Sequence, residues 1–327
     1  MQIYPASDRK DIYRNFCKKQ KDVPVFIQPW WLDLDAGAEN WDVVLVENNK
    51  QIVGAFPFCF TKLKFFKGIG MPPVAPYQGY YIVYKKEQTK VSTRLAWEQK
   101  IIKSIFTNLP EHTFFYQHFF PEIKNWMPLY WLGYKQTSKY SFLIKNIKHP
   151  ANVFSGFEQR ARKAIRKAEN ILTVSEETNS GGLIDLIQLT YQKQNINPPY
   201  DFNKLKKLTE EAVAKKVAKI YVAKDGPGNI HAASFAVWHR SRAYYIIQAS
   251  QPKYISEGGA SLLVWHAIKD ASEAGLEKFD FTGSMMPNIE KFLRSFGAVP
   301  VQRHYISKEN GFLFYWMMRV KEYVEGR

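Results

Sequence analysis

The hydrophobic pattern in the second half of the chain predicts a regular succession of helices and strands. Apolar residues spaced three and four apart predict helices near 182–194, 203–217 and 258–274. Short apolar runs bounded by glycine, proline and asparagine predict strands near 219–224, 230–238, 243–249 and 278–282. Two helices, a strand meander, a helix and a strand, in this order, are typical of an α+β, or mixed α/β, domain.

A capping pattern predicts the start of another helix. Ser155 and Glu158 have the Ser-x-x-Glu spacing in which the hydroxyl and the carboxylate bond free amides of a first helical turn. Apolar residues from Phe157 to Ala168 follow at helical spacing. We therefore expect a helix that begins at Ser155.

The pattern of the second half recurs weakly in the first half. Residues 43–58 and 220–238 each contain two β-rich runs joined by a polar turn, which predicts two similar hairpins. Downstream of each hairpin, residues 131–141 and 295–305 share a glycine followed by a closing strand. Because the matching segments lie about half a chain apart, they indicate a duplicated domain rather than a solenoid.

Residues 279–297 combine a buried strand with a group of polar side chains. The strand contains Asp280 and is interrupted at Gly283, and a helix near 289–296 ends before Gly297. Lys291 and Arg294 lie on that helix. Ligands tend to bind at the carboxyl ends of strands in α/β sheets, so we expect these groups to line a substrate site.

This segment resembles the end of the FemABX-like and BioF2-like acyltransferases, which have a D-F-x-G strand followed by F-K-x-x-F-G. Phe292, Phe296 and Gly297 are in register with that motif, and Leu293 stands where the family usually has lysine. The second half also resembles the GNAT acyltransferase fold. The resemblance implies two tandem GNAT-like domains, each a central mixed sheet flanked by helices: a degenerate first domain at 1–148, joined by 309–327, and a second at 149–308.

A glycine pair before the helix near 258–274 is the candidate donor site. Backbone amides at a helix start attract phosphate, and GNAT enzymes hold the coenzyme A pyrophosphate in a loop at this place. The resemblance therefore implies acyl-CoA as a co-substrate, with no tightly bound cofactor, held by Lys253, Gly258, Gly259, Ala260 and Ser261. Glu257 opposes anion binding here, and the alternative is that the glycines form an ordinary turn.

Two further segments are candidates for binding the substrate. Arg162 and Arg166 share one face of a basic helix, and a similar helix occurs in FemABX-like proteins; the pair suits a phosphate clamp or a solvated face. The aromatic, proline-rich stretch 65–81 suits a substrate-contacting wall or a rigid surface loop. In the first case we expect Tyr77 or Gln78 to touch the ligand.

Acyl transfer to an amine requires a group that accepts the ammonium proton. Asp280 and His304 are the candidates, and each has a structural alternative: a buried acid that caps amides, or a histidine packed on a closing strand. Neither cysteine has an adjacent histidine, and there is no Gly-x-Ser-x-Gly elbow. Direct attack of the amine is therefore favoured over a covalent intermediate. The histidines show no ligand spacing, so we predict no metal site.

The charge of the chain restricts its partners. Lysine and arginine number 46 against 30 aspartates and glutamates, a formal net charge of +16, which favours anionic partners such as coenzyme A, tRNA or an anionic lipid face.

The apolar residues 312–318, followed by Arg319 and Lys321, suit peripheral membrane contact or an element that closes the first domain. No apolar run approaches the ~20 residues of a membrane span. With two isolated cysteines and no recognisable secretory signal, we expect a cytoplasmic protein.

These observations favour an N-acyltransferase. An acyl thioester, either acyl-CoA or an acyl carrier protein, is favoured as donor over aminoacyl-tRNA because Leu293 replaces the family lysine. The acceptor is expected to be an amine of a phosphorylated or cell-envelope-related molecule. Two alternatives stay open: a catalytically inactive duplicated fold that binds an anionic partner, and an aminoacyl-tRNA-dependent transferase of the peptidoglycan-bridge type.

Overall fold

The computed structural model describes residues 1–4, 8–84 and 90–324, and the chain forms two compact units. Unit 1 comprises Met1–Lys139 and Arg303–Arg327, and unit 2 comprises Tyr140–Gln302. The chain leaves unit 1 within strand β7 (Lys135–Ile144) and returns within strand β13 (Val299–Glu309), so each of these strands has residues in both units. The expected domain boundaries, after 148 and after 308, lie a few residues beyond these two crossings.

Unit 2 contains a sheet with the strand order β7-β12-β11-β10-β9-β8. Four strands form an antiparallel meander: β8 (Thr173–Glu177), β9 (Ala218–Lys224), β10 (Ile230–His239) and β11 (Arg242–Ser250). The short strand β12 (Lys278–Asp280) runs parallel to β11 and antiparallel to β7. The sheet is therefore mixed, as the sequence pattern predicts.

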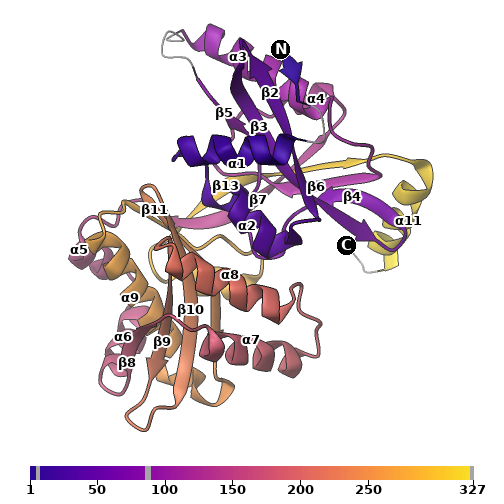
Figure 1. Ribbon diagram of the computed structural model, residues 1–327. Helices are drawn as coiled ribbons and strands as arrows, with labels where there is room; N and C mark the ends of the chain where they lie inside the picture. Colours follow the sequence, from indigo (N-terminus) through magenta and orange to yellow (C-terminus); the bar gives the residue numbers. More distant parts are fainter. Residues whose placement is uncertain (5–7, 85–89, 325–327) are drawn as a thin grey trace. The chain divides into compact units, whose positions relative to one another are not determined.

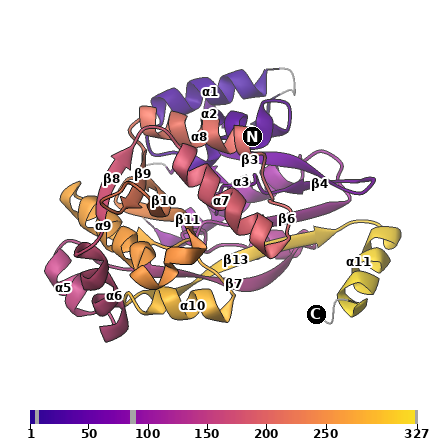
Figure 2. The ribbon, with the colours of Figure 1, turned by 90° about the horizontal axis from the view of Figure 1, so that it is seen from below.

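Helices cover both faces of the unit 2 sheet (Figure 2). One face carries α7 (Gly181–Gln194) and α8 (Phe202–Ala214). The other carries α5 (Pro150–Ser155), α6 (Gln159–Glu169), α9 (Gly259–Glu273) and α10 (Pro287–Arg294). Small strand residues such as Ala232 and Ala236 share a buried cluster with Ile165 and Leu263, which lets α6 and α9 pack closely on the sheet.

The strands of unit 1 also form parallel and antiparallel pairs, in the order β1-β2-β3-β4-β6-β13 (Figure 1). Its other strands are β1 (Gln2–Ile3), β2 (Trp41–Asn48), β3 (Gln51–Leu63), β4 (Phe66–Gly70), β5 (Tyr81–Ile82), which pairs with β3, and β6 (Phe114–His118). Its helices are α1 (Arg9–Lys19), α2 (Pro29–Leu32), α3 (Val91–Phe106), α4 (Met127–Trp131) and α11 (Phe312–Val324), with short turns at Val25–Ile27 and Asp33–Gly37. The high aromatic content is explained by its core, where Phe56, Phe106 and Phe115 pack together.

The predicted fold class is confirmed, and the predicted helices and strands of unit 2 have counterparts, with one correction at Ser155. Ser155 ends helix α5, and its hydroxyl donates to the carbonyl oxygen of Asn152 (2.8 Å). Helix α6 begins at Gln159, and the side chain of Glu158 forms no capping bond. The capping-box prediction is wrong because Pro150 starts a separate short helix, which the flexible Gly156 ends.

Among the described residues, no helix is both long enough and apolar enough to span a bilayer. Of the segment expected to contact a membrane, the side chain of Lys321 lies outside the described part of the structure, as do residues 325–327 of the expected closing segment.

Candidate functional site

Strands β11 and β12 pair over three residues and then part. Their parallel register matches Arg242 with Lys278, Ala243 with Phe279, and Tyr244 with Asp280, where β12 ends. Strand β11 continues to Ser250, so one of its edges loses its neighbour after Tyr244. A bulge lies directly beyond this point: Phe235 of β10 faces Ile247 and Ala236 faces Tyr245, which leaves Ile246 as the extra residue. A bulged residue is unpaired in its ladder, so the pairing of β11 with β10 is interrupted just beyond the point where β12 ends.

Asp280 fixes the end of β12. Its buried carboxylate accepts hydrogen bonds from the Ser141 hydroxyl and the Thr282 amide (2.8 Å) and forms an ion pair with Arg242 (3.3 Å). Thr282 in turn donates its hydroxyl to the carbonyl oxygen of Tyr245 (3.3 Å). The carboxylate therefore shapes the turn that borders the gap, which fits the structural alternative considered for this residue.

His304 lies on β13 in unit 1, so the two predicted proton acceptors belong to different units. Burial and the nearby charge of Lys124 lower the pKa of His304 below its usual value. The imidazole is therefore neutral at pH 7, the form that accepts a proton. Its backbone carbonyl accepts a hydrogen bond from the Phe119 amide (2.9 Å), within the same unit.

Gly258 and Gly259 set the start of α9 closely against its neighbours. Gly258 has a φ of +82°, and a Cβ atom there would lie 2.5 Å from the carbonyl oxygen of Ala164 on α6. A Cβ on Gly259 would touch Ala232, His231 and Leu172 at 3.4 Å. The first amides of the helix, from Gly259 to Ser261, have no intrahelical acceptors; Gly259 and Ser261 are buried and Ala260 is half-buried.

The residues before α9 form a short turn, Pro252–Glu257, that a hydrogen bond ties to α6. The Lys167 ammonium donates to the carbonyl oxygen of Ser256 (3.0 Å). Lys253 lies over the ring of Tyr254, 4.5 Å from its centroid. Of the predicted donor-site residues, Lys253, Gly258, Gly259, Ala260 and Ser261 therefore lie together on one turn and the helix that follows it.

Glu257 is engaged by a histidine that sequence reasoning missed. His231 is buried between two carboxylates, with Nδ1 3.0 Å from Glu257 and Nε2 3.2 Å from Asp225. Its ring stacks on Tyr254 at a centroid distance of 3.8 Å. The carboxylate that argued against an anion site thus has a partner of its own. No sequence signal joins these residues, because His231 and Glu257 lie in separate elements with no motif spacing.

The basic residues of α6 and α10 are largely occupied by structural contacts. Arg162 donates to the carbonyl oxygens of Ser155 (2.7 Å) and Phe157 (2.6 Å). Arg294 pairs with Glu290 (2.9 Å) and Glu158 (3.6 Å). The exposed Arg166 guanidinium lies 5.9 Å from the ring centroid of Phe154, and Lys291 is also exposed. Arg162 and Arg166 therefore turn to different partners.

Leu293 faces the core of unit 2. It is buried in the cluster that contains Phe281 and Phe296, while the neighbouring Lys291 and Arg294 point to solvent. The helical position that carries lysine in the resembling family is thus an apolar packing position here.

Tyr77 and Gln78 lie inside unit 1. Strands β4 and β6 are parallel neighbours, as β11 and β12 are in unit 2, but here the chain after β4 returns and pairs again beyond β6. The backbone N–H of Gln78 donates a hydrogen bond to the carbonyl oxygen of His118 (2.7 Å). The backbone carbonyl oxygen of Gln78 accepts one from the N–H of Phe120 (3.0 Å). Both Tyr77 and Gln78 are completely buried, so in this conformation they offer no surface to a ligand.

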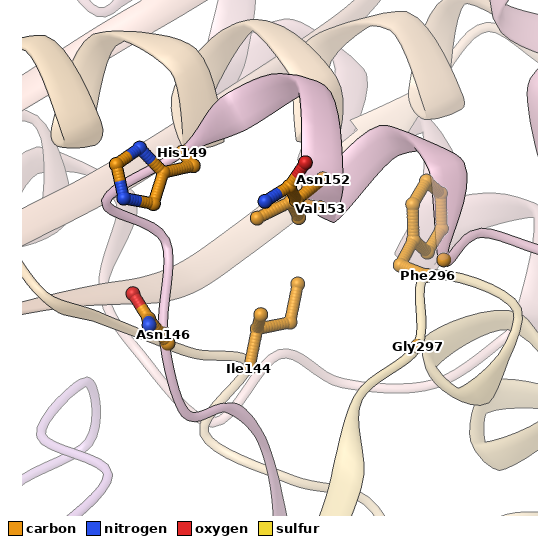
Figure 3. Close-up of a pocket in the computed structure, with 8 residues that line it drawn as sticks. Ile144, Asn146, His149, Asn152, Val153, Phe296 and Gly297 are labelled. Carbon is orange, nitrogen blue, oxygen red and sulfur yellow. The ribbon is translucent and has the colours of Figure 1, made fainter.

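Each unit also has a hollow of its own. In unit 1 a groove of about 670 Å³ is lined by Lys62, Lys67, Phe60, Met71 and neighbouring residues, and the two lysines face each other across the β3–β4 hairpin. In unit 2 a pocket of about 250 Å³ has Asn146 and His149 at one side and Phe296 at the other (Figure 3). None of the predicted site residues lines either hollow. Within the described ranges, no three histidine, cysteine or acidic side chains gather as a metal site would require.

Comparison with known proteins identifies the fold. Residues 155–288 match a family described as an acetyltransferase (GNAT) domain. No curated protein sequence matches the chain. Among solved structures, FemX aligns at 13% identity and a TM-score of 0.64, over 94% of this chain and 97% of that one. L-PGS from Bacillus licheniformis aligns at 12% identity and a TM-score of 0.54, over 99% of this chain and 98% of that one. A tandem GNAT protein from the clavulanic acid biosynthesis pathway aligns at 10% identity and a TM-score of 0.51, over 95% of this chain and 99% of that one.

Proposed function

We propose that this chain, a FemABX-like tandem GNAT acyltransferase, moves an acyl group from coenzyme A to the amine of an anionic acceptor. Acyl or aminoacyl transfer is the activity of the fold class, and the donor and acceptor are our assignment. Two observations carry the assignment: the gap between β11 and β12, and the glycine-bounded start of α9, the helix that follows β11 along the chain.

The open edge of β11 suits the extended, amide-containing arm of coenzyme A. Beyond Tyr245, whose carbonyl oxygen accepts from Thr282, residues 246–250 have no neighbour on that side among the described strands, and their backbone groups would pair with the arm. The first amides of α9 would hold the diphosphate, aided by the helix dipole. We assign the backbone amide of the bulged residue Ile246 to polarise the thioester carbonyl, as a hydrogen-bond donor to the developing oxyanion.

Transfer would proceed by direct attack. The acceptor amine forms a C–N bond to the thioester carbon, the C–S bond breaks, the thiolate leaves, and the ammonium proton passes to a base. The partners of Asp280 favour a positioning role for it, whereas the neutral imidazole of His304 suits a base. Both remain our proposed proton acceptors, and they are to be separated by the activity and stability of their variants.

An anionic acceptor is supported by the positive groups that remain exposed. Lys62 and Lys67 face each other along the unit 1 groove, and Arg166 and Lys291 are exposed in unit 2. Two adjacent ammonium groups favour a phosphate or carboxylate. We therefore propose an amine-bearing phosphorylated or cell-envelope-related acceptor.

Aminoacyl-tRNA is the second candidate for the donor. The net charge of +16 favours it, since a basic surface attracts nucleic acid. Against it stands Leu293, whose buried side chain occupies the position of the lysine in the resembling family. Acyl-CoA is therefore the preferred donor.

Titration calorimetry with acetyl-CoA and a long-chain acyl-CoA tests the donor. Ala260 is half-buried in the first turn of α9, so Ala260→Glu places a carboxylate at the proposed diphosphate site. Ala260→Gln is the matched control with the same shape and no charge. We expect micromolar binding that falls about tenfold or more in the Glu variant and changes less than about threefold in the Gln variant. No binding of either thioester would overturn the proposal and make tRNA the next ligand to test.

A further inference from the structure

Helix α11 has two faces with opposite environments. On the inner face Phe314 is fully buried and its ring contacts Phe66 (5.0 Å between centroids) and Phe114 (4.9 Å), all within unit 1. Phe312, Tyr315, Trp316 and Arg319 lie on the opposite side at helical spacing, and we call them the outer face of α11. The helix therefore closes unit 1 with only one of its sides.

The outer face exposes large aromatic side chains. Phe312 is 79% exposed and Trp316 is 52% exposed. Their rings lie near each other (5.9 Å), and Tyr315 adjoins Trp316 (6.2 Å). Contiguous exposed aromatic surface of this kind is typical of a place where another molecule docks.

The β3–β4 hairpin adds a further exposed ring to the same region. Phe65, at the tip of the hairpin, is 73% exposed and its ring packs on Phe66 (4.2 Å). Phe66 is also the residue that contacts the buried Phe314 of α11, so the hairpin tip and the helix are joined through this pair of rings. The exposed rings thus come from two elements that are packed together.

Positive charges accompany these rings. Arg319 lies 5.1 Å and Lys135 5.9 Å from the centroid of Tyr315, and Lys64 and Lys67 flank Phe65. No acidic residue occurs in the sequence 312–319 or in the hairpin 60–70. Aromatic rings that sit among lysine and arginine are the composition found at membrane interfaces, where rings enter the headgroup region and cations meet lipid phosphates.

We propose that the outer face of α11, together with the tip of the β3–β4 hairpin, docks unit 1 onto an anionic membrane surface. The chain lies on the bilayer and does not cross it, in keeping with the length and composition of its described helices. A nucleic acid would satisfy the cations but would offer no apolar layer for Phe312 and Phe65. This inference goes beyond the proposed acyl transfer and does not depend on it.

Vesicle co-sedimentation of the full chain tests the proposal. We expect binding to vesicles of phosphatidylcholine with phosphatidylglycerol, weaker binding at raised salt, and little binding to phosphatidylcholine alone. The double variant Phe312→Ser, Trp316→Ser should bind at least about tenfold more weakly. The matched control is Tyr130→Ser, Trp131→Ser, which removes two rings of similar exposure (63% and 60%) from helix α4 and should bind normally.

Three results would overturn the inference: no binding, equal binding to neutral vesicles, or an equal loss in the control variant. A dimer that dissociates in the double variant, seen by analytical ultracentrifugation, would assign the face to a second copy instead. If the double variant fails to fold, Phe65→Ser provides an independent measure, since that ring lies at an exposed hairpin tip. Calorimetry with acyl-CoA should be unchanged in every folded variant, which separates this test from that of the donor site.

Discussion

The hydroxyl group of Thr282 lies between the carbonyl oxygens of Phe281 (2.8 Å) and Tyr245 (3.3 Å) and shares its hydrogen bond between them, at the point where β12 has ended and β11 continues. Thr282 has a φ of +58°, a conformation that is strained for a β-branched residue. The hydrogen bond from its amide to Asp280 helps to hold it there. Strain of this kind is typically kept where a precise shape serves function, and here it borders the proposed donor gap.

Replacing Thr282 with glycine should separate stability from activity. Glycine adopts a positive φ without strain, so the relief offsets the lost hydrogen bond and the free energy of unfolding should change by less than about 1 kcal/mol. Acyl transfer should fall about tenfold, because the edge of the gap loses its fixed shape. Thr282→Ser keeps the hydroxyl and should retain most of the activity. Full activity in Thr282→Gly would show that this contact does not shape the site.

Replacing Asp280 with asparagine should destabilise the protein. The change leaves the poorly exposed Arg242 without its carboxylate partner, at a cost of about 2 kcal/mol in the free energy of unfolding. Urea denaturation measures this cost, and Asp185→Asn, at an exposed position on α7, is the control that should change little. A variant that folds with normal stability and yet transfers no acyl group would instead make Asp280 the proton acceptor.

Restoring the family lysine at position 293 should fail. Leu293 lies in the core of unit 2, so Leu293→Lys removes apolar packing and brings an ammonium group among buried rings, at a cost of about 3 kcal/mol. Ile289→Lys on the same helix, at a position 41% exposed, is the matched control and should be nearly neutral. Thermal unfolding distinguishes the two, and equal stability would place residue 293 at the surface in solution.

The stability of the protein should fall in mild acid because of His118. Burial, together with the charges of Arg303 and Lys139, lowers the pKa of His118 to about 3. In the unfolded chain this histidine binds a proton near pH 6.5. The neutral His118 ring therefore makes its full contribution to the free energy of unfolding above that pH, and this contribution is lost as pH falls toward about 3. We expect a loss of about 2 kcal/mol between pH 7 and pH 4, after allowing for partial exposure.

Urea midpoints at the two pH values measure the loss for His118. It should be smaller in His118→Gln, whose side chain does not titrate. The exposed His149 provides a control for the substitution itself, and His149→Gln should leave the urea midpoint at pH 7 unchanged. An unaltered pH dependence in His118→Gln would rule out this histidine as the source.

The fold of unit 2 was predictable because its information is local. Helices such as α7 and α9 have clear apolar periods, and turn residues separate β9, β10 and β11. The one local error, at Ser155, arose because the capping box matched in spacing while Pro150 had already started a helix. A capping pattern alone does not show which of two adjacent turns it serves.

The candidate site was less predictable because its contacts join distant residues. The donor loop was predicted from its glycines and stays a prediction, and nothing in the sequence indicated that His231 would lie against Glu257. Arg162 and Arg166 share a helix, yet one turns to backbone carbonyls and the other to a ring. The proline-rich segment around Tyr77 resembled a surface loop, and its burial depends on a pairing with Phe119 that periodicity does not encode.

The backbone pairing of Gln78 with the end of β6 affects the number of donor sites expected in each chain. In unit 1 the chain itself occupies the space beside β6 that in unit 2 is open beside β11. A duplicated fold would ordinarily suggest two equivalent donor sites for each polypeptide. With one of the two filled from within, a titration should saturate at a stoichiometry of one coenzyme for each chain.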